Sequence, residues 1–234
     1  MRLAVLDDDR SLCADIAARL RRAGHGCFEF YTGESLRRAL RSESFDLLLV
    51  DWNVADLSGS ALLVWARANL PAPPPVVIMT EPGAPDGVAD GADDSLVKPV
   101  DLPLLENRVT TVLHRAYGGR TMTARVEAFG DHAFDQVAMT VTVAGTPVSL
   151  TAKEFGLALL LFRNLGRPLS RGHIMESVWG RMPDVPTRTL DAHVSQVRRH
   201  LGLRPENGFR LSSVYGFGYM LERREMDDFK DAGS

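Results

Sequence analysis

Residues 3–9 read LAVLDDD, a run of four apolar residues followed at once by three carboxylates, Asp7, Asp8 and Asp9. A short apolar run bounded by charge is typical of a buried strand. The preference of Asp for turns is the simplest explanation of the carboxylates when they are taken alone. Neighbouring like charges repel each other, however, so their clustering requires a group that compensates them.

The first half of the chain alternates short apolar runs with segments of helical spacing. The predicted strands are residues 3–6, 27–30, 45–50, 76–79 and 95–97, and the predicted helices are residues 11–23, 34–41 and 101–115. Strands that alternate with helices indicate a parallel sheet covered on both faces. The predicted fold class of residues 1–119 is therefore α/β, a flavodoxin-like, doubly wound sheet of five parallel strands.

Further polar side chains follow the other predicted strands. Asp51 ends the third strand, Thr80 ends the fourth, and Lys98 ends the fifth, just before Pro99. A cis Lys98–Pro99 bond is one way to aim the lysine back at this edge. In an open parallel sheet, ligands bind outside the carboxyl ends of the strands. Mg²⁺ prefers a few carboxylates together with water and phosphate oxygens, so the sequence predicts a magnesium site at this edge.

The second half has a different rhythm. Its predicted strands are residues 126–135, 139–143 and 147–150, its predicted helices are residues 151–165, 170–179 and 187–201, and its final hairpin pairs residues 209–213 with 217–221. Thr151 and Glu154 form the sequence pattern of a capping box at the start of the first helix. We expect an α+β domain over residues 126–224, a linker over 120–125 and a disordered tail over 225–234.

Charge is distributed unevenly along the 234 residues. Residues 1–119 hold 12 Lys/Arg and 17 Asp/Glu, a net charge of −5, whereas residues 120–224 hold 14 and 9, a net charge of +5. A basic domain joined to an acidic one suggests a polyanionic partner for the second half.

Composition restricts the class of protein further. With 45% hydrophobic and 24% charged residues, the chain can build ordinary packed cores. Its apolar runs are too short to cross a bilayer, and charge by residue 7 argues against a signal peptide, so we expect a cytoplasmic protein with no membrane partner. Cys13 and Cys27 lack metal-ligand spacing. We expect both to be reduced and buried, with a redox pair as the alternative.

The predicted helix 187–201 has two distinct faces. Its buried stripe is predicted to consist of Leu190, Val194, Val197 and Leu201. The opposite side carries Arg188, Asp191, Ser195, Arg198 and Arg199, with Gln196 beside them. A helix of this kind, following another helix and a turn, suits the DNA major groove, where Gln can pair with adenine and Arg with guanine or phosphate. A merely solvated helix face is the alternative, and the charge balance of +5 argues against it.

Three further residues are candidates for DNA contact. Ser213 and Tyr215 lie on the predicted hairpin and could approach the minor groove or the backbone, and His193 either contacts phosphate or lies at the helix surface. Trp179 and Tyr219 are expected to pack in the core instead of stacking on a ligand.

Several motifs carry a resemblance to a known family. They are DDD, FDLLLVD and GADDSLVKP in the first half, and LTAKEF, VWG, RTLDAHVSQVRRHLG and VYGFGY in the second. Residues 1–119 resemble the receiver domain of bacterial response regulators, and residues 125–222 resemble the winged-helix domain of the OmpR/PhoB family. The resemblance covers almost the whole chain and implies a DNA-binding transcriptional regulator of a two-component system.

The resemblance also implies roles for the residues at the sheet edge. Asp51 would accept a phosphoryl group from a phosphohistidine on a sensor kinase, and Asp8, Asp51 and the Asn53 backbone carbonyl would bind Mg²⁺ directly, with Asp7 acting through water. Lys98 would pair with a phosphoryl oxygen, and Thr80 would swing to bond another. The protein would catalyse only its own phosphorylation and dephosphorylation, and would bind promoter DNA, at direct repeats, as a homodimer at least on DNA.

This chain departs from the family pattern in both halves. Residues 81–90, EPGAPDGVAD, contain two Pro and two Gly where relatives place a helical stretch, so we expect the fourth helix of the receiver to be shortened or absent. Ser95 occupies the usual aromatic switch position, and Ala55 replaces a common Pro. Ser195 and Gln196 stand where many relatives carry two basic residues, and Tyr215 replaces a frequent Arg.

Three alternatives are compatible with the sequence. The first is a DNA-binding regulator that works without phosphorylation, and the second is a receiver that only sequesters a protein partner, which would leave Arg188 and Arg198 without a role. The third is a phosphohydrolase similar to the haloacid dehalogenases, with Asp7 as nucleophile and Asp9 as general acid. That family needs a larger core and a lysine before its late acidic pair, whereas Asp93 and Asp94 precede Lys98 here.

Overall fold

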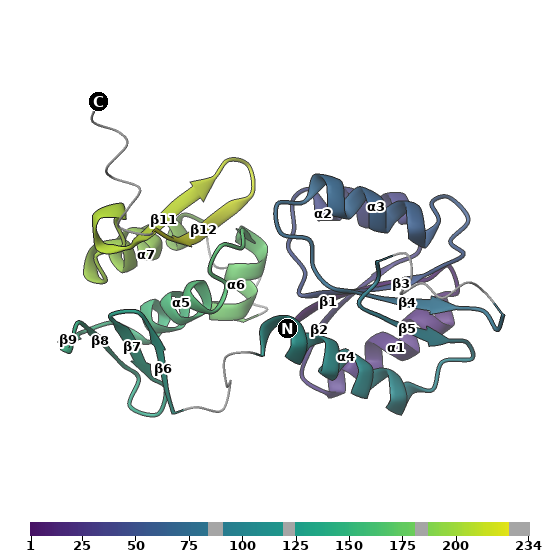
Figure 1. Cartoon of the computed structure of the whole chain (residues 1–234), viewed down its shortest axis with the longest axis horizontal. Helices are drawn as coiled ribbons and strands as arrows, with labels where there is room; N and C mark the ends of the chain where they lie inside the picture. The colour runs from purple at the N-terminus through teal and green to yellow at the C-terminus, as the bar shows by residue number, and fades with distance from the viewer. Residues whose placement is uncertain (84–90, 119–124, 181–186, 225–234) are drawn as a thin grey trace. The chain divides into compact units, whose positions relative to one another are not determined.

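The computed structural model describes residues 1–83, 91–118, 125–180 and 187–224. The chain divides into two compact units, Met1–Gly119 and Arg120–Ser234 (Figure 1). Each unit has its own hydrophobic core and is described by itself.

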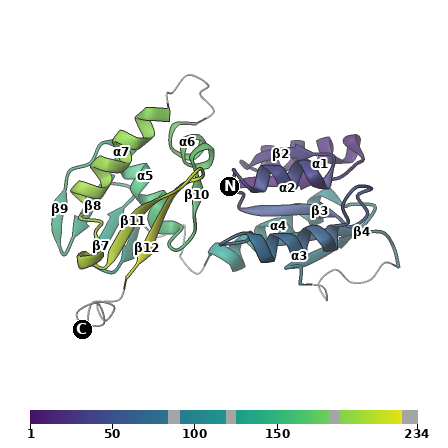
Figure 2. The same cartoon turned by 90° about the horizontal axis from the view of Figure 1, so that it is seen from above.

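The first unit is built on a five-stranded parallel sheet. Its strands are β1 (Arg2–Leu6), β2 (Gly26–Phe30), β3 (Leu47–Asp51), β4 (Val76–Thr80) and β5 (Asp94–Val97), and they lie in the order β2-β1-β3-β4-β5. Its helices are α1 (Arg10–Arg22), α2 (Gly33–Leu40), α3 (Gly59–Asn69) and α4 (Leu102–Tyr117). Figures 1 and 2 show α2 and α3 over one face of the sheet and α1 and α4 over the other. This confirms the predicted doubly wound α/β fold.

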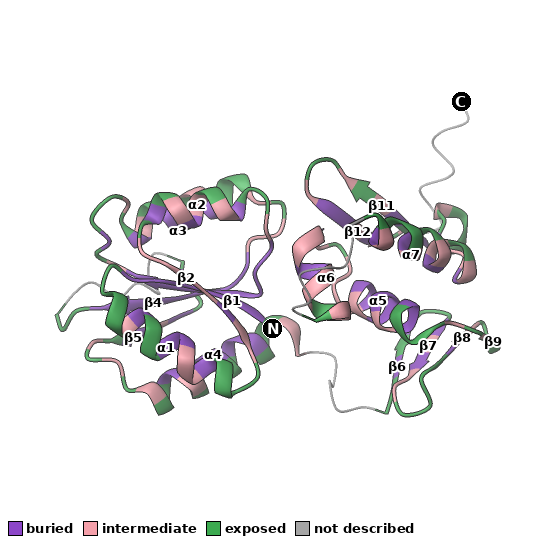
Figure 3. Ribbon diagram, turned by 180° about the vertical axis from the view of Figure 1, so that it is seen from behind, coloured by how far each residue is buried: buried purple, intermediate pink, exposed green. Residues whose placement is uncertain are grey.

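The central strands are buried along their whole length, as continuous apolar runs require (Figure 3). Two clusters of buried side chains, one on each face of the sheet, bind the helices to it. The register places Leu6 beside Val50, Asp51 beside Met79, and Thr80 beside Val97. The carboxyl ends of β1, β3, β4 and β5 therefore meet at one edge.

Helix α3 is absent from the sequence-based prediction. It buries Leu62, Leu63 and Ala66, but Val64 on its outer side is 67% exposed. Apolar residues on both sides blur the stripe by which an amphipathic helix is recognised, and this explains the omission.

The predicted loss of the receiver's fourth helix concerns residues 81–90, and residues 84–90 lie outside the described part of the chain. The flanking residues 81–83 and 91–93 are not helical. The expectation therefore stays a prediction.

In its described residues, the second unit combines two antiparallel sheets with three helices. In the first sheet the strands pair in sequence order: β6 (Val126–Phe129), β7 (His132–Asp135), β8 (Thr140–Val143) and β9 (Thr146–Val148). The second sheet has the strand order β10 (Leu169–Ser170), β12 (Gly218–Arg223) and β11 (Phe209–Val214). The helices are α5 (Ala152–Arg163), α6 (Arg171–Trp179) and α7 (Thr187–His200), with a 3₁₀ turn at Pro205–Asn207. The predicted α+β winged-helix architecture is confirmed.

One predicted strand is wrong. Residues 126–135 form not one strand but the hairpin β6–β7, in which Val126 pairs with Asp135 and Phe129 with His132. The chain reverses at Gly130, whose φ of 57° is a left-handed conformation that glycine adopts without steric cost.

The core of the second unit includes the predicted stripe of α7. Leu190, Val194, Val197 and Leu201 are all at most 1% exposed and belong to one cluster with the aromatic residues of β7 and α5. The predicted capping box is also present, since the Thr151 side chain accepts from the Glu154 N–H and the Glu154 carboxylate accepts from the Thr151 N–H.

Neither cysteine forms a disulfide, and both are buried, as expected. Cys13 lies on α1 with its Sγ 3.6 Å from the Val5 carbonyl oxygen, and burial raises the pKa of this thiol to about 12.

We predict that Cys13 resists alkylation while the protein is folded. A thiol with a pKa of about 12 is thiolate in roughly one molecule in 10,000 at pH 8, and only the thiolate reacts. Iodoacetamide treatment at pH 8, followed by peptide mass analysis, should label Cys13 quickly in urea and very slowly without it. Labelling of the folded chain at the rate of a free cysteine would contradict the prediction.

Candidate functional site

Three carboxylates converge where β1 and β3 end. Ligand oxygens of Asp7, Asp8 and Asp51 all lie within 4.8 Å of one another. Asp7 is fully buried and Asp51 is 3% exposed, whereas Asp8 faces solvent. Such a group of buried like charges is stable only when positive charge lies close to it.

Lys98, the residue after β5, supplies one positive charge. Its Nζ lies 3.0 Å from Asp7 Oδ2 and 3.1 Å from Asp51 Oδ1, so a single ammonium group joins the two buried carboxylates. The Lys98–Pro99 peptide bond is cis.

Burial and charge act against each other in this cluster. Burial raises the pKa of Asp7, and the neighbouring Lys98 opposes that rise. Burial alone would lower the pKa of Lys98, but its contacts with Asp7 and Asp51 outweigh burial and raise it. Lys98 therefore remains an ammonium group at neutral pH, while Asp7 remains short of compensating charge.

The donor set fits a hard divalent cation. The three carboxylates come from two strand ends, and the carboxylate of Asp8 is open to solvent. This set matches the ligands that Mg²⁺ takes when it keeps several waters. Asp7 Oδ2 is buried and has the Lys98 ammonium group 3.0 Å away, but it lacks a well-aligned hydrogen bond among the described residues. Asn53, whose backbone carbonyl is a predicted ligand, lies exposed in the loop that follows β3.

Thr80 lies at the same sheet edge but its hydroxyl is directed elsewhere. The residue is 4% exposed, and its Oγ1 donates to the Leu96 carbonyl oxygen of β5 at 3.5 Å. A bond of that length is weak. The hydroxyl is therefore held only loosely against β5.

The third carboxylate of the opening run has a structural task. Asp9 is the N-cap of α1, and its Oδ1 accepts from the Ser11 N–H at 2.9 Å and the Leu12 N–H at 3.2 Å. A capping side chain held this way satisfies donors at the start of the helix. The run of three therefore divides into two cluster residues and one cap, which disfavours Asp9 as a general acid.

Helix α7 presents the polar face that the sequence predicts. Arg188, Ser195 and Arg199 are exposed, and Gln196 is half-buried. An Arg199 guanidinium nitrogen donates to Gln196 Oε1 at 2.5 Å, so these two side chains form a pair. Arg198 is half-buried and its Nε donates to the Leu211 carbonyl oxygen of β11 at 3.1 Å. Arg198 is thus partly engaged within its own domain.

His193 and Trp179 pack on each other. Their ring centroids lie 5.1 Å apart with the rings nearly perpendicular, and His193 Nδ1 lies 2.8 Å from the Thr189 carbonyl oxygen. Trp179 packs against the hydrophobic core, as expected. His193 is half-buried, so one ring edge is used in packing.

Asp191 on α7 is tied to two other elements. Its Oδ1 accepts from Arg171 Nη1 at 2.7 Å and from the Tyr219 hydroxyl at 2.5 Å, and these contacts lower the pKa of Asp191. Tyr219 is 8% exposed, in agreement with its predicted core position. Arg171 thus compensates the one acidic group on the polar face of α7, and the trio fixes α7 to α6 and β12.

The hairpin β11–β12 carries the remaining candidates. Ser213 is exposed near the end of β11, and Tyr215 in the turn is fully exposed.

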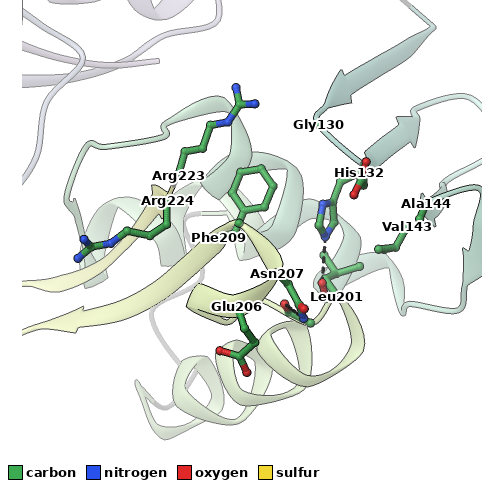
Figure 4. A pocket seen from close by; sticks show the side chains of 13 residues that line it. Gly130, His132, Val143, Ala144, Leu201, Glu206, Asn207, Phe209, Arg223 and Arg224 are labelled. Carbon is green, nitrogen blue, oxygen red and sulfur yellow. Dashed lines mark hydrogen bonds between the residues drawn. The ribbon is translucent and has the colours of Figure 1, made fainter. Parts of the chain in front are cut away.

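A separate pocket of about 780 Å³ lies in the second unit, away from the predicted site residues. Its lining includes Gly130 and His132 of the β6–β7 hairpin, Phe209 of β11 and Arg223 of β12 (Figure 4). His132 is 2% exposed, and its Nε2 lies 2.9 Å from the Leu201 carbonyl oxygen. Its ring packs on Phe162 and Phe209, so His132 serves the core.

None of the helices in the described ranges has the length and apolar character needed to cross a membrane.

Comparison with known proteins agrees with this architecture. Residues 3–110 match the family described as response regulator receiver domain, and residues 145–221 match the family described as transcriptional regulatory protein, C terminal. The chain is 32% identical over 224 residues to the sensory transduction protein RegX3 of Mycolicibacterium smegmatis, an alignment that covers 93% of this chain and 97% of the relative.

Two further relatives have the same extent. The phosphate regulon transcriptional regulatory protein PhoB of Pseudomonas aeruginosa is 30% identical over 227 residues, covering 95% of this chain and 97% of PhoB. The crystal structure of the response regulator DrrB of Thermotoga maritima, an OmpR/PhoB homolog, is 26% identical, covers 94% of this chain and 98% of DrrB, and has a TM-score of 0.44.

The chain therefore belongs to the OmpR/PhoB family of two-component response regulators. It consists of a receiver domain and a DNA-binding transcriptional regulatory domain. A receiver domain implies a sensor kinase as partner, and the second domain implies DNA.

Proposed function

We propose that this response regulator is switched by phosphorylation of Asp51 by a partner histidine kinase and then controls transcription at promoter DNA. The arrangement of Asp7, Asp8 and Asp51 within 4.8 Å of one another, with Lys98 3.1 Å from Asp51, carries the proposal. It unites a nucleophile, ligands for a cation and an ammonium group.

In this proposal an Asp51 carboxylate oxygen attacks phosphorus, and an O–P bond forms as the P–N bond of the phosphohistidine breaks. Asp8, Asp51 and the Asn53 backbone carbonyl would hold Mg²⁺, with Asp7 acting through water. When bound, Mg²⁺ neutralises charge on the transferring group, which is the main requirement of such a reaction. Lys98, already beside Asp51, pairs with a phosphoryl oxygen.

Thr80 converts the added charge into movement. Its bond to the Leu96 carbonyl oxygen, at 3.5 Å, is weak enough to be exchanged for a bond to the phosphoryl group. Charge added at Asp51 would thus change a contact between β4 and β5. The proposal includes no reaction on any other substrate.

A DNA-binding regulator that works without phosphorylation is the second candidate. Ser95 favours it, since no aromatic ring stands at the switch position to respond when Thr80 moves. The phosphohydrolase alternative is weaker, because Asp9 is used as a helix cap.

We predict that Asp51 is the sole phosphorylation site. Incubation of the full chain with acetyl phosphate and Mg²⁺ should add one acid-labile phosphoryl group. The intact mass should then rise by about 80 Da, the mass of HPO₃. Asp51→Asn keeps the size of the side chain but removes the nucleophilic carboxylate, and it should take up none. Asp15→Asn, on the exposed side of α1, is the matched control. Equal uptake by wild type and Asp51→Asn would refute the assignment.

For DNA, we infer that α7 enters the major groove and that the β11–β12 turn reaches the minor groove or the backbone. The proposed contacts are Arg188, His193, Ser195, Gln196, Arg198, Arg199, Ser213 and Tyr215. Exposure of Arg188, Ser195, Arg199 and Tyr215 supports this role. Pairing of chains on direct repeats would place two α7 helices in successive grooves. The DNA-binding domain is predicted to span residues 126–224. The predicted linker, residues 120–125, would let it act separately from the receiver domain.

We predict that Gln196 reads a base whereas Arg198 or Arg199 mainly contacts phosphate. Gln196→Ala should cost about 1–3 kcal/mol at one base position. Arg198→Ala should weaken binding to all sequences and reduce the dependence of DNA binding on salt. Arg198 is held against β11, so we expect it to contact phosphate and not a base. Binding to a panel of single-base variants of the site at two salt concentrations measures both. Equal, sequence-independent losses for the two variants would remove the base-reading role.

A further inference from the structure

The loop between β3 and α3, residues 52–58, is attached to the start of α2, whose first residues precede Asp56 by more than twenty positions. Asp56 Oδ1 accepts from the Gly33 N–H at 2.8 Å, and Asp56 Oδ2 accepts from the Glu34 N–H at 3.0 Å. N–H groups in the first turn of a helix have no partner within the helix. One carboxylate of the loop therefore satisfies two donors at the start of α2.

The contact is close as well as polar. A Cβ placed on Gly33 would lie 2.5 Å from the Leu57 Cβ and 3.1 Å from the Leu57 carbonyl oxygen. Gly33 does not have a positive φ, so its lack of a side chain serves this approach and not the backbone conformation. The loop and α2 touch without room for one methyl group.

The two ends of the same loop are also fixed. The Trp52 N–H donates to the Met79 carbonyl oxygen at 2.8 Å, and the Gly59 N–H donates to the Trp52 carbonyl oxygen at 3.0 Å. A Cβ on Gly59 would lie 3.0 Å from the Asp51 carbonyl oxygen. Asn53 lies between the attachment at Trp52 and the attachment at Asp56.

We propose that Asp56 is a positioning residue for the cation site: it anchors the loop on α2 and so fixes the Asn53 backbone carbonyl beside Asp51. The inference rests on the proposed function, in which that carbonyl binds Mg²⁺. A group that orients a metal ligand contributes to affinity without touching the metal. If the loop were loose, binding would have to pay for ordering it.

Two other roles for Asp56 make different predictions. A helix cap alone would stabilise the fold and leave cation affinity unchanged. A general attraction of cations by negative charge would be shared by Glu34, an exposed residue in the first turn of α2. Its backbone N–H donates to Asp56, and its carboxylate pairs with Arg37. The backbone N–H groups also lower the pKa of Asp56, so the carboxylate keeps its charge at neutral pH.

The test is titration of the full chain with Mg²⁺, with tryptophan fluorescence as the signal that reports binding. Trp52 adjoins Asp51, and a Trp52→Phe variant identifies its signal. Asp56→Ala should raise the dissociation constant about tenfold, the low end of the range for losing a group that orients a ligand. Gly33→Ala, which pushes on Leu57 from the other side, should also raise it. Asp56→Asn retains one acceptor and should lie between Asp56→Ala and wild type.

Glu34→Gln is the matched control and should stay within about twofold of wild type, since it removes a charge without loosening the loop. Thermal unfolding without Mg²⁺ reports stability separately. A lower unfolding temperature with unchanged Mg²⁺ affinity in Asp56→Ala would overturn the inference, and so would an equal loss in Glu34→Gln. If wild type itself shows no Mg²⁺ response, the proposed function fails and the inference fails with it. Wild-type binding with no loss in Asp56→Ala and Gly33→Ala refutes the inference alone.

Discussion

Compensation of buried negative charge at the end of β1 and β3 is the constraint on which the first domain depends. Asp7 and Asp51 are buried side by side, and Lys98 lies about 3 Å from both. Two carboxylates share one ammonium group, which leaves an excess of negative charge that a divalent cation would balance. The sheet order makes this possible, because β1, β3 and β5 bring residues from three parts of the chain to one edge.

The meeting of these side chains at one sheet edge could be predicted from the sequence, because each lies at or just after the end of a strand. Continuous apolar runs identify β1, β3 and β4, and the parallel arrangement then brings their ends together. Helix α3 escapes prediction because Val64 on its outer side is apolar. The turn at Gly130 escapes prediction because strand-forming aromatic residues lie on both sides of it, Phe129 before and Phe134 after.

Contacts between segments far apart in the chain could not be predicted. Asp56 is 23 residues from Gly33, and Asp191 is 20 residues from Arg171 and 28 from Tyr219. Nothing local distinguishes Asp56 from any other turn residue, or Asp191 from other polar residues on α7. Both residues join separate elements. Asp56 attaches a loop to α2, and Asp191 fixes α7 to α6 and β12. The sequence likewise gives no sign that Arg198 bonds to β11.

The central claim is that a change of charge at Asp51 alters DNA binding by the other domain. The most direct measurement is the affinity of the full chain for labelled DNA from upstream of its own gene, by fluorescence anisotropy, with and without acetyl phosphate and Mg²⁺. We predict tighter binding by the phosphorylated wild type and no response by Asp51→Asn. Equal affinity in both conditions, with phosphoryl uptake verified by mass, would contradict the account and favour a regulator that works without phosphorylation.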